Sequence, residues 1–136
     1  MPYTEPPCGK LTVRAGTTSV SGEVRRADGL YVTVVEGDLV GGPIGLEFAI
    51  LRLTHSIRSR LPLVAPEGWE VTAECEGRGK HRVVFADVDL HFDADDRARE
   101  EIWNALQELP RHTLSDAIES GAQLVRRCVE SEARKV

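Results

Sequence analysis

The chain of 136 residues is 41% hydrophobic and 29% charged, which is typical of one folded globular domain. Its net charge is −5 and only 5% of its residues are aromatic, so neither feature favours nucleic-acid binding. No apolar stretch approaches the roughly 20 residues that cross a bilayer, and the first residues lack the basic and apolar regions of a signal peptide. We therefore expect a cytoplasmic single domain over 1–136, with neither nucleic acid nor membrane as a partner.

The first half of the chain predicts strands followed by one long helix. Residues 1–10 are rich in proline and are expected to form a flexible N-terminal arm. The elements expected after it are strands at 11–15, 18–26 and 30–35 and a helix at 46–61. Asp28-Gly29 predicts a tight turn between the second and third strands, and the glycines of 37–45, with Pro43, predict a loop.

The helix expected over 46–61 carries more apolar surface than one stripe. The residues that recur at spacings of three and four are Leu46, Ile50, Leu53, Ile57 and Leu61. Phe48, Ala49 and Leu51 add apolar surface on other sides. This surface exceeds a single apolar stripe, so we expect a central helix that is buried on more than one side.

The second half predicts two strands, two helices and a last strand. The expected elements are strands at 69–76 and 82–92, a helix at 97–109, a short helix that starts at His112 or Thr113 and runs to residue 120, and a strand at 122–129. Gly121 is placed to end the short helix, and 130–136 is a charged tail. The order βββ-α-ββ-α-α-β is that of an α+β domain and lacks the alternation of a dinucleotide-binding fold.

Three cysteines, Cys8, Cys75 and Cys128, are widely spaced along the chain. They form no Cys-x-x-Cys pair and no zinc-binding spacing. In a cytoplasmic chain we expect three free thiols, two of them buried, and neither a metal nor another cofactor.

Two segments resemble the signature of the OsmC/Ohr family. Residues 42–56, Gly-Pro-Ile-Gly-Leu-Glu-Phe-Ala-Ile-Leu-Arg-Leu-Thr-His-Ser, are similar to its Gly-Pro-x-Pro-x-Glu-Leu loop and the long central helix that follows. In that family the peroxidatic cysteine stands nine residues after the glutamate, and here Ser56 stands nine residues after Glu47. Residues 111–124 are similar to the segment that carries the family's resolving cysteine, and His112 takes the place of that cysteine.

This resemblance implies an intertwined homodimer in which the central helices pack back to back between the sheets and each sheet is completed by strands of the partner. The residues expected around a site at the dimer interface are Ser56, His112, Glu47, His55, Arg52 and Thr113. A serine cannot form the thiolate and the sulfenic acid through which a cysteine reduces a peroxide. We therefore expect the dimer to bind a small, partly apolar ligand there rather than to act as a thiol peroxidase.

Other functions stay open at this point. One is an organic hydroperoxide reductase of the stress response that uses other cysteines. A second is a hydrolase in which His112 activates Ser56 and Glu47 orients the imidazole, although the chain has no Gly-x-Ser-x-Gly elbow. A third is a metal site of His55, His112 and Glu47, and a fourth is a structural or partner-binding dimer without a small-molecule site. The simplest interpretation is that Ser56 fills a small space in a packed helix and that His112 is a polar residue before a helix.

Overall fold

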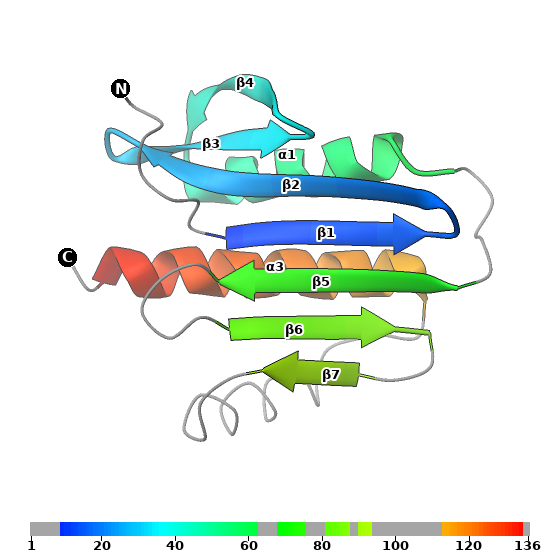
Figure 1. Cartoon of the computed structure of the whole chain (residues 1–136). Coiled ribbons are helices and arrows are strands. Elements are labelled where there is room, and N and C mark those ends of the chain that lie inside the picture. Colours follow the sequence, from blue (N-terminus) through cyan, green and yellow to red (C-terminus); the bar gives the residue numbers. More distant parts are fainter. Residues whose placement is uncertain (1–8, 63–67, 76–80, 88–89, 94–112, 135–136) are drawn as a thin grey trace.

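The computed structural model describes residues 9–62, 68–75, 81–87, 90–93 and 113–134. Within them, seven strands form one antiparallel sheet in the order β4-β3-β2-β1-β5-β6-β7 (Figure 1). The strands are β1 (Gly9–Ala15), β2 (Thr18–Ala27), β3 (Leu30–Val35), β4 (Asp38–Ile44), β5 (Trp69–Cys75), β6 (His81–Ala86) and β7 (Leu90–Asp93). The described helices are α1 (Leu46–Ser59) and α3 (Leu114–Arg134). The chain is therefore a mixed α+β protein, as its sequence predicts.

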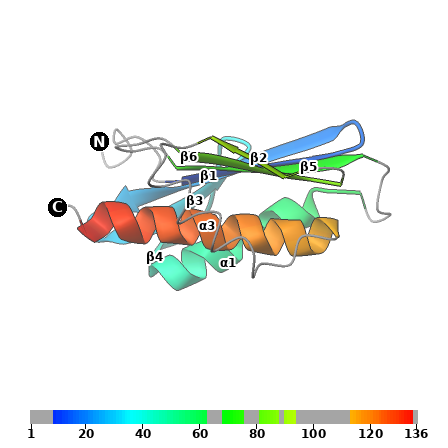
Figure 2. The same ribbon diagram turned by 90° about the horizontal axis from the view of Figure 1, so that it is seen from below.

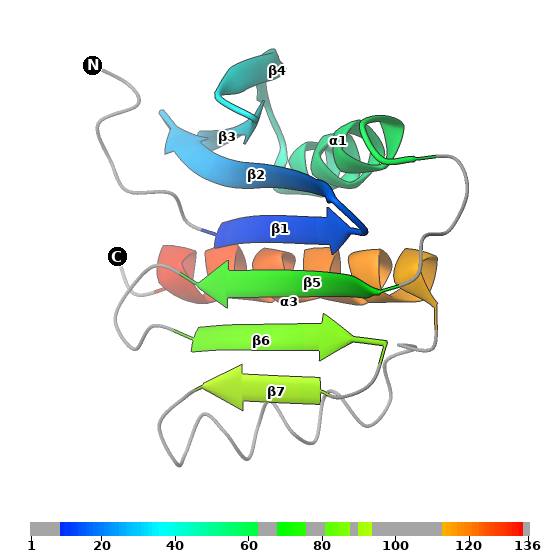
Figure 3. The same ribbon diagram turned by 45° about the vertical axis from the view of Figure 1, so that its right-hand side comes forward.

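Both described helices lie on one face of the sheet (Figure 2). Helix α1 packs against β2, β3 and β4, whereas α3 packs against β1, β5 and β6, and the two helices contact each other. Figure 3 shows α3 running behind β1 and β5. The layer between the sheet and the helices is the core, and its largest fully buried side chains include Phe85, Leu11, Leu53 and Ile57.

Strand β1, at the centre of the sheet, shows how alternating apolar and polar residues place one face of a strand in the core. Leu11 and Val13 are 0% exposed and face the helices, while Lys10 and Thr12 alternate with them on the opposite face. Val71 of β5 pairs with Val13 and continues the buried row across the sheet. The strands predicted at 11–15, 18–26 and 30–35 are confirmed, as is the described part, 69–75, of the strand predicted at 69–76. Gly9 and Lys10, which the prediction assigned to the N-terminal arm, belong to β1.

Two turns with positive φ close the hairpins on either side of β3. Asp28 (φ 48°) and Gly29 (φ 81°) join β2 to β3, as the Asp-Gly pair predicts. Glu36 (φ 53°) and Gly37 (φ 82°) join β3 to β4. Glutamate is uncommon in this conformation, and its side chain compensates, because Oε1 of Glu36 accepts a hydrogen bond of 2.8 Å from the Ser21 N–H.

The loop predicted over 37–45 is wrong, because β4 occupies Asp38–Ile44. This strand is at the edge of the sheet and pairs only with β3, so the missing N–H of Pro43 is tolerated. The register of the β3–β4 pair shifts along its length, and Gly41 takes a positive φ of 74°. The glycines and the proline therefore belong to an irregular edge strand.

The short helix, the last strand at 122–129 and the separate tail are also wrong, because α3 runs without interruption over Leu114–Arg134. Gly121 does not end a helix. It lies inside α3, where a Cβ would stand 2.6 Å from Leu11 Cδ1, so the absence of a side chain lets α3 approach the sheet closely. The buried residues that follow a helical spacing of four, three and four are Ile118, Ala122, Val125 and Val129.

The single strand predicted at 82–92 is wrong as well. The chain forms β6, reverses its direction and forms β7, with Phe85 paired to Leu90. Exposed Asp87, a poor strand former, follows β6 directly. The observed order thus begins ββββ-α-βββ rather than βββ-α-ββ. The helix predicted at 97–109 and the residue His112 lie outside the described residues.

Candidate interaction face on helix α1

Helix α1 begins and ends much as its sequence predicts. Gly45 is extended (φ −60°, ψ 154°), and its carbonyl accepts a helical hydrogen bond of 3.0 Å from the Ala49 N–H. Glu47 lies in the first turn and Arg58 in the last turn, which are the ends where an acid and a base interact favourably with the helix dipole. The helix predicted over 46–61 is confirmed to within two residues of its end.

The inward side of α1 is fully packed. Ala49, Leu53 and Ile57 are 0% exposed. On β2, a Cβ at Gly22 would stand 2.6 Å from Leu53 Cδ1, so glycine at this position allows the helix to lie directly on the sheet. The buried hydroxyl of Thr33 donates to the Ala49 carbonyl at 2.7 Å and joins β3 to the helix. This side of α1 is therefore part of the core.

The outward side of α1 exposes large apolar side chains. Phe48 is 56% exposed and Leu51 is 59% exposed, and the exposed His55 follows at a spacing of four. Residues at spacings of three and four are neighbours on a helix surface, and we call Phe48, Leu51 and His55 the α1 stripe. In the described part of the chain, the other exposed large hydrophobic side chains are Leu30 and Leu39, on strands β3 and β4. Adjacent apolar side chains that are this exposed are typical of contact surfaces.

The structure separates Ser56 from Glu47. Ser56 is 8% exposed on the inward side, whereas Glu47 is exposed. Their spacing of nine residues puts them about 180° apart around the helix and about 13 Å apart along its axis. His55 adjoins Ser56 in sequence but is exposed. The described residues therefore do not bring Ser56, Glu47 and His55 together at one site.

Two further residues that the sequence places near a ligand have structural partners. Arg52 donates from Nη1 to the Gly42 carbonyl at 2.9 Å and so holds α1 to β4. Thr113 caps α3, because its Oγ1 accepts from the Asp116 N–H at 3.1 Å and its carbonyl accepts from the Ala117 N–H at 2.9 Å. The helix predicted to start at His112 or Thr113 begins one residue later, at Leu114.

Arg58 joins the end of α1 to the start of α3. Its Nη2 lies 3.2 Å from the carbonyl oxygen of Ser115, 3.0 Å from the Ser115 hydroxyl and 3.0 Å from Oε1 of Glu119. The sequence prediction did not include Arg58 among the candidate residues. The available signal was a basic residue in the last turn of an expected helix.

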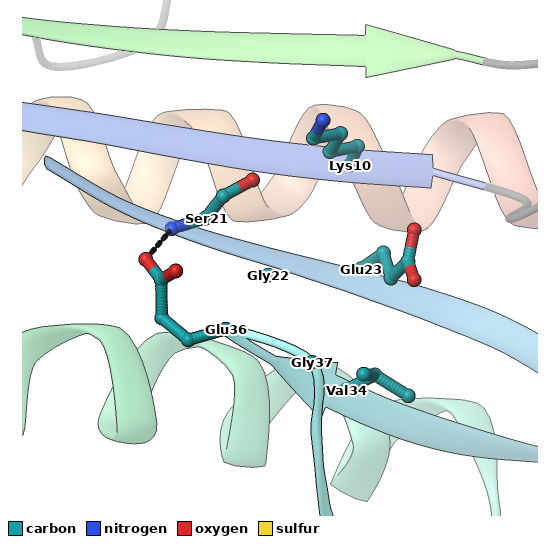
Figure 4. Close-up of a pocket in the computed structure, with 7 residues that line it drawn as sticks. All are labelled: Lys10, Ser21, Gly22, Glu23, Val34, Glu36 and Gly37. Atoms are coloured by element: carbon teal, nitrogen blue, oxygen red, sulfur yellow. Dashed lines mark hydrogen bonds between the residues drawn. The ribbon is translucent and has the colours of Figure 1, made fainter.

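A shallow hollow of about 200 Å³ lies on the sheet face opposite the helices (Figure 4). Its lining consists of Lys10, Ser21, Gly22, Glu23, Val34, Glu36 and Gly37. Both carboxylates already have partners, since Glu36 accepts from the Ser21 N–H and Glu23 accepts from Arg25 Nε at 2.9 Å. The hollow is therefore a weaker candidate than the α1 stripe.

The resemblance to the OsmC/Ohr family places a serine and a histidine, not cysteines, at the two redox positions of that family. Cys75 is buried and Cys128 is only partly buried, while Cys8 lies outside the described residues. Across the described ranges, no three His, Cys, Asp or Glu side chains are grouped so that they could hold a metal ion. Neither α1 nor α3, the helices that the structure describes, is long and apolar enough to span a membrane.

Comparisons with protein-family models, with curated proteins and with solved structures found no match to this chain. The assignment of a candidate site therefore rests on the geometry of the chain itself.

Proposed function

We propose that this chain is a homodimeric binding domain without thiol-peroxidase chemistry, in which the α1 stripes of two copies pack against each other. The observation that carries the proposal is the exposure of Phe48 and Leu51, 56% and 59%, on a helix whose other side is buried. Burying the exposed half of such a side chain contributes about 1 kcal/mol, and polar contacts beside the stripe contribute as well.

The competing enzymatic functions have less support. A hydrolase needs Ser56 to be accessible to a substrate and near its acid, but Ser56 is 8% exposed and Glu47 lies on the other side of α1. These observations favour Ser56 as a small residue in a packed helix. A peroxidase needs an accessible thiolate. Cys75 is buried, so among the described residues such a function would depend on the partly exposed Cys128.

The resemblance to the OsmC/Ohr family stays a prediction. It is supported by the start of α1 directly after Gly45, where the central helix of that family also begins, although residues 42–44 belong to β4 and not to a loop. Strand β4 and helix α3 depart from the element order that the resemblance implies. The small, partly apolar ligand expected between the two copies stays a separate prediction, because stripes in direct contact leave it no place at Phe48, Leu51 and His55. Native mass spectrometry of the dimer tests for such a ligand.

Sedimentation velocity over a range of protein concentrations tests the dimer. The wild-type chain is expected to pass from a monomer of 15.0 kDa to a dimer as its concentration rises. Leu51→Asp is expected to stay monomeric, because an unpaired carboxylate is costly to bury. The matched control is Leu39→Asp, because Leu39 is 51% exposed but lies on β4.

Circular dichroism should show that both variants fold. A wild-type chain that is monomeric at every concentration would end the proposal, and so would a Leu51→Asp variant that dimerises as the wild type does. A Leu39→Asp variant that loses the dimer equally would also contradict the assignment to α1.

A further inference from the structure

The charges beside the α1 stripe are ordered along the helix. Glu47 lies in the first turn and Arg58 in the last turn. Their spacing of eleven residues is about three full turns, so both lie on the same flank of the stripe. Between them, over about 16 Å of helix, the stripe presents Phe48, Leu51 and His55. This flank of α1 therefore begins with a carboxylate and ends with a guanidinium that also pairs with Glu119 of α3, while Arg52 lies on the other flank.

We infer that two copies of the chain pack their α1 helices antiparallel about a two-fold axis near Leu51, with each Glu47 facing the partner's Arg58. The inference rests on the proposed homodimer and adds the relative direction of the two α1 helices and the charged residues that favour it. In an antiparallel pair the acidic end of each helix meets the basic end of the other, so the favourable contact forms twice. A parallel pair would place like charges at the same height, would bring no Glu47 to a partner's Arg58, and would align the helix dipoles unfavourably.

The spacing of the stripe fits this arrangement. If the two-fold axis passes between Leu51 and Arg52, a residue of one helix lies level with a residue of the partner helix when their two numbers add up to about 103. Leu51 then packs against the partner's Leu51, and Phe48 packs against the partner's His55. Glu47 and the partner's Arg58 are offset by about 3 Å along the axis, which two side chains of this length span.

Arg58 has donors left for such a contact. In the described part of the chain, the contacts of the Arg58 guanidinium with Ser115 and Glu119 are all made by its Nη2 atom. A guanidinium presents further N–H groups on Nε and Nη1, and the Arg58 side chain is 37% exposed. Arg58 can therefore hold α3 with one nitrogen and face a second copy with the others.

Disulfide cross-linking tests the direction of the two helices. The background is a chain with Cys8→Ser and Cys128→Ser, in which Cys75 stays because it is buried. Leu51→Cys is expected to cross-link to itself, and Phe48→Cys mixed with His55→Cys is expected to cross-link between the two chains. Phe48→Cys alone is expected not to do so, because two copies of that position would be about 10 Å apart along the axis, beyond the reach of a disulfide. Leu39→Cys is the matched control on β4 and is expected to stay unlinked.

Sedimentation in increasing salt tests the charges. At low salt, Glu47→Gln is expected to dimerise about threefold to tenfold more weakly than the wild type and to lose most of the salt dependence. Asp38→Asn removes an exposed acid of β4 and serves as the control that keeps both properties.

The outcomes separate the inference from the proposal on which it rests. Self-cross-linking of Phe48→Cys, without cross-links between Phe48→Cys and His55→Cys, would indicate a parallel pair and overturn the inference while the homodimer stands. A Glu47→Gln variant with the salt dependence of the wild type would also overturn it. A wild-type chain that never dimerises in sedimentation would remove both.

Discussion

Replacing Gly121 with alanine tests how closely α3 approaches the sheet. The added Cβ would stand 2.6 Å from Leu11 Cδ1 and 3.0 Å from Val71 Cγ1, and Leu11 is 0% exposed. Such overpacking costs about 1–3 kcal/mol, whereas the same change in an exposed helix gains about 1 kcal/mol. We expect the free energy of unfolding to fall by about 1 kcal/mol.

Urea unfolding followed by circular dichroism measures this effect. Leu11→Val removes the crowded Cδ1, so the double variant is expected to lose less than the sum of the two changes, by about 0.5 kcal/mol or more. Gly29→Ala is the matched control, because its φ is +81° and no atom lies within 4 Å of the added Cβ. It is expected to cost about 1 kcal/mol through its backbone, without coupling to Leu11→Val. A Gly121→Ala variant that gains stability would refute the close contact of α3 with β1.

Three further changes test other contacts and the function. Glu36→Ala is expected to lose about 1 kcal/mol of unfolding free energy, because the Ser21 N–H loses its acceptor, whereas Glu36→Gln keeps an oxygen there. If Glu36→Ala and Glu36→Gln lost equal amounts of unfolding free energy in the same urea assay, this role of the Glu36 oxygen would be contradicted. Arg58→Ala is expected to speed amide hydrogen exchange at the start of α3, and exchange as slow as in the wild type would show that Arg58 does not hold α3. Replacing Cys8 and Cys128 by serine and Cys75 by alanine is expected to leave hydroperoxide consumption unchanged, and thiol-dependent turnover that disappears in this variant would support the peroxidase instead.

Much of the sheet and the helix α1 could be predicted from residue spacing. Alternation around Leu11 and Val13, together with the Asp28-Gly29 turn, was sufficient for the strands of the first hairpins. Strand β4 is not predicted by its sequence because glycine and proline are typical of loops, although an edge strand tolerates both. The sequence predicts a helix end at Gly121, and the close contact with Leu11 explains why this glycine lies inside α3.

The candidate site was predicted only in part. The excess apolar surface of the segment 46–61 was visible in the sequence, and its exposed members are Phe48 and Leu51. That Ser56 and Glu47 lie on opposite sides of α1 could have been inferred from their spacing of nine residues. The contacts of Arg58 with Ser115 and Glu119 join segments more than fifty residues apart, and such contacts depend on tertiary packing that local patterns do not report.

The place of β1 in the sheet has a consequence for how the nascent chain folds. Val13 of β1 pairs with Val20 of β2 on one side and with Val71 of β5 on the other. The β1–β2 pair forms within one hairpin, whereas the β1–β5 pair can form only after β5 has been synthesised. During synthesis, β1 to β4 and α1 can assemble while the free edge of β1 remains open. An open edge invites pairing with another chain, and pairing between distant segments is slow. Variants that slow the docking of β5 should therefore reduce the yield of folded protein more than their equilibrium stability suggests.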